Sequence, residues 1–521
     1  MSRSFCLIAL ACLSLPPAIF GFDVDSLLKI SVGGDAGLKT VTSMRSYRAV
    51  GEVEFNGLAG RFEEIVAPPN KLILRLRFPQ FSMTQAFDGI EAWQQDVNGR
   101  ISTLSGFERA ELLRSLYFEG FAHVVPDRIP GSYEYWGDTT IQGESLKLVR
   151  FFPPDADTMI VGYDAATGLR RVTFSRMDDL LTVMTNDQYQ NVDGVPIAMR
   201  QTGITIGAPI EITMRIDTAA FNLDVDTGIF TRPDIANQVR PFPSAGGSVE
   251  MPFDYVNGHI LVVATLNGKK RVRLILDSGA SATLLNSATT QDLGLPEVGR
   301  MPARGVAGFQ EVALVRIDSV ALGELSLYSQ IGGLTDLRMI ATSPDELPIG
   351  GVIGYNFLSQ YPILIDYQRS MLVVYDPAKF EPPTEGIKVP FDLTMQVPTV
   401  RATIGGVEGE FLVDLGNALG LIVHEQFATE HKFDELFSAT VSDDRIIGGV
   451  GGKMRGRAYV APEFTVGDLT LTDIPVLVAE SSQGITGSRQ IDGNIGSEVF
   501  RTYHVVFDYQ RHQLYLLPLA D

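Results

Sequence analysis

Short apolar runs separated by polar turns dominate the first half of the chain. Within these runs apolar and polar side chains tend to alternate, which is the period of β-strands with one buried face. Turn signals such as Asn98-Gly99 and Asp193-Gly194 lie between the runs. We therefore predict an antiparallel sheet. Its strands include Tyr47 to Phe55, Lys71 to Phe78, Leu146 to Phe152, Arg170 to Phe174 and Ile210 to Ile216.

One segment of this half has a helical period instead. Between Glu108 and Tyr117, the side chains of Leu112, Leu113 and Leu116 fall on one helical face. We predict a helix there. The stretch Ala236 to Ser248 has no apolar period and is rich in proline and glycine, which is typical of a linker. The first domain is therefore expected over residues 22–235, followed by a linker over 236–248.

Beyond the linker the chain repeats itself, and repeats of this kind define the architecture. Four stretches return in the same order: Pro252-Phe253-Asp254 as Pro390-Phe391-Asp392, Leu274-Ile275-Leu276-Asp277-Ser278-Gly279-Ala280 as Phe411-Leu412-Val413-Asp414-Leu415-Gly416-Asn417, Gly351-Val352-Ile353-Gly354 as Gly493-Asn494-Ile495-Gly496, and Asp366-Tyr367-Gln368-Arg369 as Asp508-Tyr509-Gln510-Arg511. Their spacings differ only by a short loop insertion. We expect two tandem lobes, over 249–378 and 385–521.

In each copy an apolar strand ends on an aspartate that is followed two residues later by glycine. Asp277 and Asp414 would lie at strand-to-turn junctions, where the glycine lets another backbone approach closely. One such aspartate is usually a turn residue, but two copies related by a pseudo-twofold axis can bring both carboxylates together. Such a pair shares a proton, so one carboxylate can deprotonate water while the other protonates a carbonyl.

The repeated motif resembles the pepsin and retropepsin aspartic proteases. The resemblance is carried by Asp277-Ser278-Gly279-Ala280 and by Val352-Ile353-Gly354, with Gly496 at the matching place in the second copy. The pattern from Phe357-Leu358 to Asp366-Tyr367 is similar to the exported bacterial branch of the family. The resemblance covers a little over half of the chain. It implies a bilobal double β-barrel that cleaves a peptide or protein substrate without a cofactor or metal.

The same resemblance implies a β-hairpin flap over the cleft. Glycines suited to such a mobile lid are Gly305 and Gly308 in the first copy and Gly449 and Gly451 in the second. A plain surface loop is the alternative interpretation of both segments.

The second copy departs from the family pattern at two positions. Leu415 stands where the family has threonine or serine, and Asn417 where it has a small residue. In the family the missing hydroxyl forms a hydrogen bond across the lobe interface and keeps the carboxylates coplanar. A buried donor without a partner costs about 1–3 kcal/mol. We therefore expect either a locally rebuilt interface around Leu415 and Gly416 or a distorted carboxylate pair.

The first domain resembles the half-barrel of periplasmic lipoprotein carriers. The resemblance rests on short motifs: Gly51 to Phe55, Asp88-Gly89 before Trp93, Tyr163-Asp164 to Gly168-Leu169, and Tyr189 with Asp193-Gly194-Val195-Pro196. It implies a curved antiparallel sheet whose apolar cavity binds an acyl chain or an extended peptide. In the alternative interpretation these residues form a closed core, and the domain is an accessory that presents substrate.

Charge and the first residues narrow the choice of partners and compartment. A formal net charge of -20 opposes binding to nucleic acid or anionic membranes. Residues 1–21 have the pattern of a secretory signal, with Arg3 before an apolar run that is shorter than the roughly 20 residues of a membrane span. We expect an exported protein, periplasmic or extracellular. A lipid anchor at Cys12 is the less favoured alternative.

Other catalytic chemistries have little support. Both cysteines, Cys6 and Cys12, lie in the predicted leader, so neither disulfides nor thiol catalysis is expected in the mature chain. His424 and His431 lie seven residues apart, which does not suit a helical zinc pair, and we expect both at the surface.

The sequence therefore predicts an exported aspartic endopeptidase. The first alternative is a protease-fold protein, impaired at Leu415, that binds a peptide or lipid. The second is activity from two chains that pair their first copies.

Overall fold

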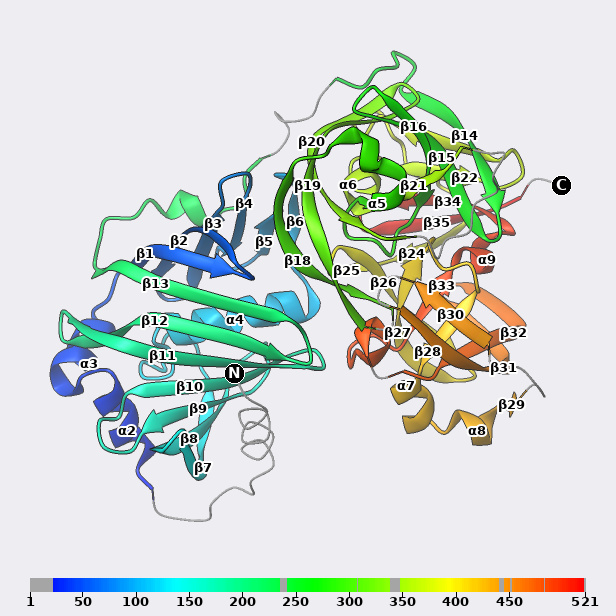
Figure 1. Ribbon diagram of the computed structural model, residues 1–521. Helices are drawn as coiled ribbons and strands as arrows, with labels where there is room; N and C mark the ends of the chain where they lie inside the picture. The colour runs from blue at the N-terminus through cyan, green and yellow to red at the C-terminus, as the bar shows by residue number, and fades with distance from the viewer. Residues whose placement is uncertain are drawn as a thin grey trace. The chain divides into compact units, whose positions relative to one another are not determined.

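The chain divides into two compact units, Met1–Asn237 and Gln238–Asp521, and each is described by itself (Figure 1). The computed structural model describes residues 22–234, 241–306, 308–337, 347–439, 445–449, 452–481 and 483–519. The predicted leader, 1–21, and the first part of the predicted linker lie outside the described residues. Within the described residues, no helix is both long and apolar enough to cross a membrane.

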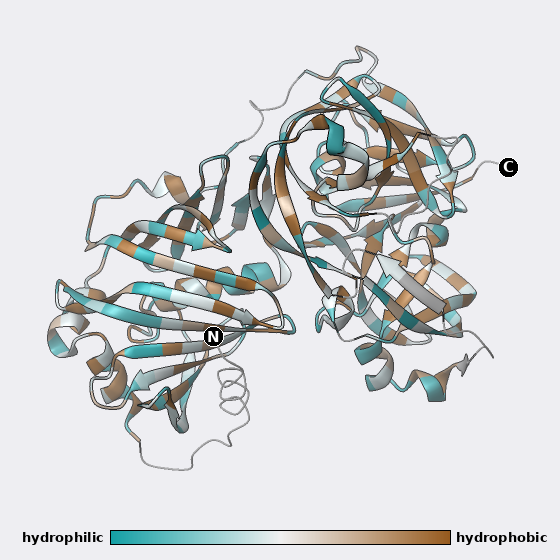
Figure 2. Ribbon diagram, in the orientation of Figure 1, coloured by the Kyte–Doolittle hydropathy of each residue, from teal (hydrophilic) through white to brown (hydrophobic). Residues whose placement is uncertain are grey.

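Unit 1 is built on one antiparallel sheet with the strand order β6-β5-β4-β3-β2-β1-β13-β12-β11-β10-β9-β8-β7. The strands are β1 (Tyr47–Phe55), β2 (Leu58–Ala67), β3 (Lys71–Arg77), β4 (Ser82–Phe87), β5 (Ala92–Gln95), β6 (Ile101–Thr103), β7 (Ser132–Ile141), β8 (Glu144–Phe152), β9 (Met159–Asp164), β10 (Arg170–Met177), β11 (Leu180–Val192), β12 (Val195–Ile206) and β13 (Ile210–Phe221). The chain runs to one edge and returns from the other, so β1 and β13 pair in the middle. Hydrophobic and polar positions alternate along β13 in Figure 2, as its sequence predicts.

The sheet of unit 1 curves around a single long helix (Figure 1). This helix, α4 (Gly106–Glu119), covers the segment predicted as helical from its leucines. Leu112, Leu113 and Leu116 pack with Phe62 and Val66 of β2 in one apolar core. That core therefore joins α4 to the sheet. Shorter helices of this unit are α2 (Val24–Ser31), α3 (Gly34–Thr42) and η1 (Thr227–Phe230).

A cluster of ionisable side chains lies in unit 1 close to α4. Arg170 forms an ion pair of 3.4 Å with Glu119. Burial, followed by the negative charge of Glu119, raises the pKa of Glu64 to about 8. Burial, followed by the positive charge of Arg170, lowers the pKa of His123 to about 3, and its ring stacks on Phe118. Both Glu64 and His123 are therefore neutral at pH 7.

Unit 2 contains two further sheets. The larger has the order β18-β19-β20-β17-β21-β16-β15-β14-β23-β22-β34-β35-β24, and the smaller β25-β26-β27-β33-β28-β32-β31-β29, with β30 paired to β31. The strands are β14 (Ser248–Val256), β15 (His259–Leu266), β16 (Lys270–Leu276), β17 (Leu284–Asn286), β18 (Glu297–Gly305), β19 (Gly308–Leu322), β20 (Leu325–Thr335), β21 (Ile349–Ile353), β22 (Ile363–Asp366), β23 (Met371–Tyr375), β24 (Ile387–Pro390), β25 (Asp392–Thr394), β26 (Val397–Ile404), β27 (Val407–Asp414), β28 (Leu421–His424), β29 (Ser438–Ala439), β30 (Arg445–Gly449), β31 (Gly452–Val466), β32 (Leu469–Ala479), β33 (Gly493–Gly496), β34 (Tyr503–Asp508) and β35 (Gln513–Pro518). The predicted class, mainly β with a curved sheet followed by a bilobal protease-type unit, is confirmed.

The repeat seen in the sequence appears in unit 2 as a pseudo-twofold axis. Strands β22 and β34 come from the two copies and pair antiparallel, with Leu364 opposite Val506. These two residues are equivalent in the repeat, so the axis passes between them. The outer strands follow the same symmetry, because Pro252 of β14 faces β23 and its equivalent Pro390 of β24 faces β35. One apolar core continues through both lobes.

Short helices complete unit 2 and follow the ends of strands. They are α5 (Ser287–Thr290), η2 (Gln291–Leu293), α6 (Tyr355–Leu358), α7 (Glu425–Glu430), α8 (Phe433–Leu436), η3 (Gly484–Gly487) and α9 (Ser497–Phe500). Because α6 and α9 each follow a repeated Gly-x-x-Gly strand, they are also related by the pseudo-twofold axis.

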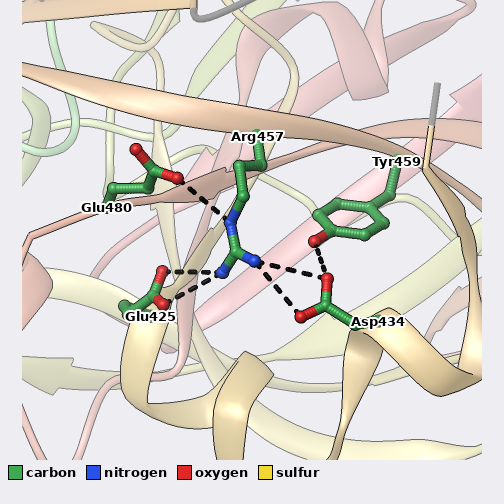
Figure 3. Close-up of polar contacts among 5 residues, drawn as sticks. All are labelled: Glu425, Asp434, Arg457, Tyr459 and Glu480. Carbon is green, nitrogen blue, oxygen red and sulfur yellow. Dashed lines mark hydrogen bonds and ion pairs between the residues drawn. The ribbon is translucent and has the colours of Figure 1, made fainter. Parts of the chain in front are cut away.

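One arginine ties α7 and α8 to the second lobe (Figure 3). Arg457 of β31 binds both oxygens of Glu425 at 2.9 and 3.1 Å and contacts Asp434 at 3.2 Å. Its Nε lies 3.2 Å from Glu480, and the Tyr459 hydroxyl donates to Asp434. Three carboxylates thus converge on one guanidinium, and losing that cation would leave them to repel one another.

We expect Arg457→Met to destabilise unit 2 by about 1–3 kcal/mol, because hydrogen bonds to charged groups are worth this much and three carboxylates lose their partner. Arg401→Met is the matched control: Arg401 bonds Glu410 at 2.8 Å but is 76% exposed, so its removal changes stability little. Urea unfolding measures both variants. Equal midpoints for the two would show that the Arg457 cluster does not stabilise the lobe.

We also expect Glu64 to make unit 1 less stable as pH rises. Its pKa is raised from 4.5 to about 8 in the folded state, so folding favours the protonated form and that stabilisation is lost between these values. His123 has its pKa lowered from 6.5 to about 3, and its contribution is lost as pH falls below 6.5. Between pH 6.5 and 8 only the Glu64 effect remains of the two. Glu64→Gln should flatten this slope in hydrogen exchange of β1–β3, and an unchanged slope would contradict the assignment.

Candidate active site

The two motif aspartates stand at equivalent strand ends. Asp277 follows β16, and its N–H donates to the carbonyl of Ile353 in the parallel neighbour β21 at 3.0 Å. Asp414 ends β27 and lies opposite Gly496 in the parallel neighbour β33. The two aspartate side chains therefore occupy equivalent positions on either side of the pseudo-twofold axis.

Each motif glycine lies against the carboxylate of the other lobe. A Cβ atom added to Gly279 would lie 2.5 Å from Cγ of Asp414, and one added to Gly416 would lie 2.5 Å from Cγ of Asp277. Any side chain at either position would push the lobes apart. The same glycines hold their own aspartates, because Gly279 N–H donates to Asp277 Oδ1 and Gly416 N–H to Asp414 Oδ1, both at 2.8 Å. The structure thus brings the two predicted carboxylates together.

The pair can hold one proton. Burial raises the pKa of Asp277 well above its usual range, and the negative charge of Asp414 and a hydrogen bond with it raise the pKa further. Two N–H groups, from Gly279 and Ala280, oppose the shift without cancelling it. A proton on Asp277 therefore removes the repulsion between two adjacent carboxylates.

One serine bridges the lobes below the carboxylates. The Ser278 hydroxyl donates to the Val413 carbonyl at 2.7 Å and accepts from the Leu415 N–H at 2.9 Å. By symmetry, a hydroxyl at position 415 would make the same two bonds to the backbone of Leu276 and Ser278. Leu415 cannot make them, and its fully buried side chain packs in the apolar core instead. Of the two symmetric hydroxyl bridges between the aspartate turns, the structure therefore retains one, and the carboxylates are still adjacent.

The predicted supporting glycines close the two aspartate turns from behind. A Cβ at Gly354 would lie 2.1 Å from the Ala280 carbonyl, which accepts the N–H of Tyr355 at 2.9 Å. A Cβ at Gly496 would lie 2.4 Å from the carbonyl of Asn417. Glycine is needed at both positions because the backbone of the aspartate turn leaves no room for a side chain.

An asparagine that the sequence interpretation did not single out contacts the pair. Asn494 of β33 donates from Nδ2 to Asp414 Oδ2 at 2.6 Å and accepts from Asn417 Nδ2 at 2.8 Å. The equivalent positions in the first copy are the apolar Val352 and Ala280. The signal was present in the repeat, since Asn494 replaces an apolar residue within an otherwise matching stretch.

The first predicted flap is a hairpin whose tip reaches the second lobe. Strands β18 and β19 pair up to Gly305 and Gly308. Arg304 donates to the carbonyl of Gly484 at 2.8 Å, and the hydroxyl of Thr486 donates to the carbonyl of Val306 at 3.2 Å. The two hydrogen bonds thus join the end of the hairpin to η3 of the second lobe.

Tight packing adds to this contact. Val306 packs with Ile422, Met454 and Leu477 of the second lobe, and a Cβ at Gly484 would lie 2.3 Å from the carbonyl of Gly305. The hairpin thus spans from one lobe to the other.

The second predicted flap is the hairpin of β30 and β31. Gly449 pairs with Gly452 at its described end, while Gly451 lies outside the described residues. A Cβ at Gly449 would lie 2.8 Å from a methyl group of Val306, so the described ends of the two hairpins touch.

Two further ionisable groups surround the pair. His259 begins β15, burial lowers its pKa, and the negative charge of Asp414 partly reverses this shift. Burial raises the pKa of Tyr509 well above its usual value, and the charges of both aspartates add to the rise. Both groups are therefore uncharged near pH 7. The main change in the charge of the site is the loss or gain of the proton that the two carboxylates share.

The histidines considered for metal binding are not arranged as a metal site. His424 was expected at the surface, which is wrong: it is 1% exposed and its Nδ1 bonds the carbonyl of Ile491 at 2.7 Å. It ends a strand rather than lying within a helix, and α7 separates it from His431. Among the described residues, no group of three or more histidine, aspartate, glutamate or cysteine side chains is placed to hold a metal ion.

The serine bridge leads to a direct test of the lobe interface. We expect Ser278→Ala to destabilise unit 2 by about 1–3 kcal/mol, because the Leu415 N–H loses its acceptor in a buried place. Ser278→Thr keeps the hydroxyl and serves as the control. Urea unfolding compares the two, and an alanine variant as stable as the parent would show that the bridge contributes nothing.

Comparison with known proteins agrees with this geometry. Residues 262–357 and 400–499 both match the family model described as aspartyl protease. No curated protein matches the chain.

Similar solved structures include an aspartic proteinase from Irpex lacteus (11% identity, 52% of this chain and 98% of that chain, TM-score 0.35). Others are a putative outer membrane lipoprotein-sorting protein domain from Vibrio parahaemolyticus (13%, 40% and 97%, TM-score 0.30) and a LolA superfamily protein from Nitrosomonas europaea (10%, 41% and 99%, TM-score 0.31). The family matches fall on the two copies that supply Asp277 and Asp414. The chain therefore contains two tandem regions, residues 262–357 and 400–499, that match the aspartyl protease family.

Proposed function

We propose that the chain is an exported aspartic endopeptidase that hydrolyses peptide bonds with Asp277, Asp414 and a water molecule. The observation that carries this proposal is the mutual packing of the motifs, in which Gly279 and Gly416 each lie against the carboxylate of the other lobe. That packing leaves the two carboxylates in one site. The raised pKa of Asp277 supports a pair that holds a single proton.

The reaction follows from that proton. The ionised carboxylate takes a proton from water as the water oxygen forms a bond to the peptide carbonyl carbon, and the protonated carboxyl donates its proton to the carbonyl oxygen. In the second step the carboxyl group that took a proton from water passes it to the amide nitrogen, and the C–N bond breaks. The other carboxylate recovers its proton from a hydroxyl group of the tetrahedral intermediate. Both steps conserve protons within the pair, so no metal or cofactor is required.

The hairpin of β18 and β19 supports a role as the lid of this site. It extends from the first lobe and is held on the second through Arg304 and Val306. A lid held at its tip would exclude water from the carboxylates and would have to detach for substrate to enter. Its backbone groups near Gly305 and Gly308 are suited to binding an extended peptide main chain.

Leu415 gives the alternative proposal a specific basis. Between the two aspartate turns only Ser278 supplies a bridging hydroxyl, so these turns hold the pair less firmly than a symmetric pair of hydroxyls would. If the weaker hold displaces the two carboxylates from each other, the protein would bind a peptide without cleaving it. The adjacency of the carboxylates favours the peptidase. Because Asp277 already faces Asp414 of its own chain, pairing of two chains is the least favoured of the three hypotheses.

Unit 1 is proposed as an accessory domain that presents substrate. A ligand with an apolar chain is a further proposal for this unit, although α4 packs by its leucines on the sheet in the principal apolar core. Export, to the periplasm or beyond, is proposed from the predicted leader, and a free mature chain is preferred to a lipid-anchored one.

We expect Asp277→Asn and Asp414→Asn each to lower peptide cleavage by about 10²–10⁴-fold, because each removes one partner of the acid–base pair. Asp468→Asn alters an exposed turn of the second lobe and is the control. The parent should show a bell-shaped pH profile, since cleavage needs one carboxylate ionised and the other protonated, and should be inhibited by a transition-state analogue of pepstatin type.

The outcomes separate the three hypotheses. Full activity in Asp414→Asn would refute the shared pair and favour pairing of two chains. No cleavage by the parent, with cleavage gained in Leu415→Thr, would establish the impaired binding protein.

A further inference from the structure

The two carboxylates have different neighbours, although the repeat makes their positions equivalent. Each accepts the N–H of the glycine in its own turn at 2.8 Å. Asp414 also accepts a side-chain N–H, from Asn494 at 2.6 Å on its other oxygen. The residue equivalent to Asn494 in the first copy is Val352, an apolar side chain that is 7% exposed and has no donor to offer.

The orientation of the Asn494 amide is set by its neighbours. Asn417 uses its Oδ1 to accept the N–H of Leu419 at 2.8 Å, so its Nδ2 faces away and donates to the carbonyl of Gly420 and to Asn494 Oδ1, both at 2.8 Å. With its oxygen occupied by a donor, Asn494 presents its own NH₂ group to Asp414. At the position equivalent to Asn417 the first copy has Ala280, which can make none of these bonds.

We propose that Asn494 is a positioning residue that keeps Asp414 ionised as the general base and so leaves the shared proton on Asp277 as the general acid. The inference rests on the proposed peptidase function. A donor to a carboxylate favours its charged form, and Asp414 has a side-chain amide donor for which the first lobe has only the apolar Val352. The braced amide also fixes the rotation of the Asp414 carboxylate, so that its free lone pairs face the water it deprotonates.

The surroundings of Asp414 agree with this assignment. The titratable groups that face it are Asp277 from the first lobe, His259 at the start of β15, and Tyr509, which packs against Tyr355. Burial lowers the pKa of His259, so it becomes a cation only in acid, and the raised pKa of Tyr509 keeps that phenol neutral. None of them places a second negative charge beside Asp414 while Asp277 is protonated.

Asn494→Val copies the first lobe and tests the inference. We expect kcat to fall about tenfold with KM little changed, and the acid limb of the pH profile to move up by about one unit, because the charged form of the base loses a donor. Asn494→Ser keeps a donor, so its kcat and its acid limb should lie between those of the parent and the valine variant. Val352→Ala is the control from the equivalent position, and it should leave the acid limb where it is.

A second readout does not depend on cleavage. Carbon-13 NMR of the aspartate carboxyl groups, assigned with Asp277→Asn and Asp414→Asn, follows the titration of the pair in the full-length mature chain. We expect the first deprotonation of the pair to require a higher pH in Asn494→Val. If that variant fails to fold, Asn417→Ala is the substitute. It removes the hydrogen bond from Asn417 that orients the Asn494 amide, and it should shift the titration in the same direction.

The outcomes of the two readouts are distinct. Parental cleavage, pH profile and titration in Asn494→Val overturn the inference and leave the proposed function standing. A parent that cleaves no peptide overturns the proposed function. In that case a shifted carboxyl titration in Asn494→Val still supports the placement of the proton on Asp277. An unshifted titration overturns that placement.

Discussion

The close approach of two aspartate turns across a pseudo-twofold axis governs the second unit of this protein. Gly279 and Gly416 leave room for the opposite carboxylate and for nothing larger. Because the approach brings two carboxylates together, a proton on one of them removes their mutual repulsion. The continuous apolar core and the pairing of β22 with β34 provide the packing that holds the two turns in place.

Sequence divergence between the copies has made the two halves of the site unequal. One lobe keeps the bridging hydroxyl on Ser278, and the other has Leu415 packed in the core. In return, the second lobe holds its aspartate with Asn494 and Asn417, polar residues that the first lobe lacks. A homodimer would have to place the same groups on both sides. A duplicated single chain can assign the acid and the base to different lobes by changing a few side chains.

Stability and access at the site depend on different kinds of contact. The Arg457 cluster fixes the helices α7 and α8 to the second lobe through charged hydrogen bonds. The hairpin of β18 and β19 contacts the second lobe near its end, through hydrogen bonds of Arg304 and Val306 and through packing of the Val306 side chain. A contact at the end of a hairpin can open locally while the sheet behind it stays folded, which is what a lid over a buried site requires.

The sequence by itself determined the repeat, the strands, the helix α4 and the two aspartates, because these depend on local periodicity and on residues that recur at equal spacing. It also pointed to Leu415 as the weak position of the second copy. Only the tertiary structure decided that Ser278 alone supplies a hydroxyl bridge between the two aspartate turns, that His424 is buried, and that Asn494 contacts Asp414. Asn494 lies 80 residues from Asp414 in the chain, and parallel strands bring the two together. Hydrogen bonds between side chains so far apart leave no periodic signal, so they appear only when the chain has folded.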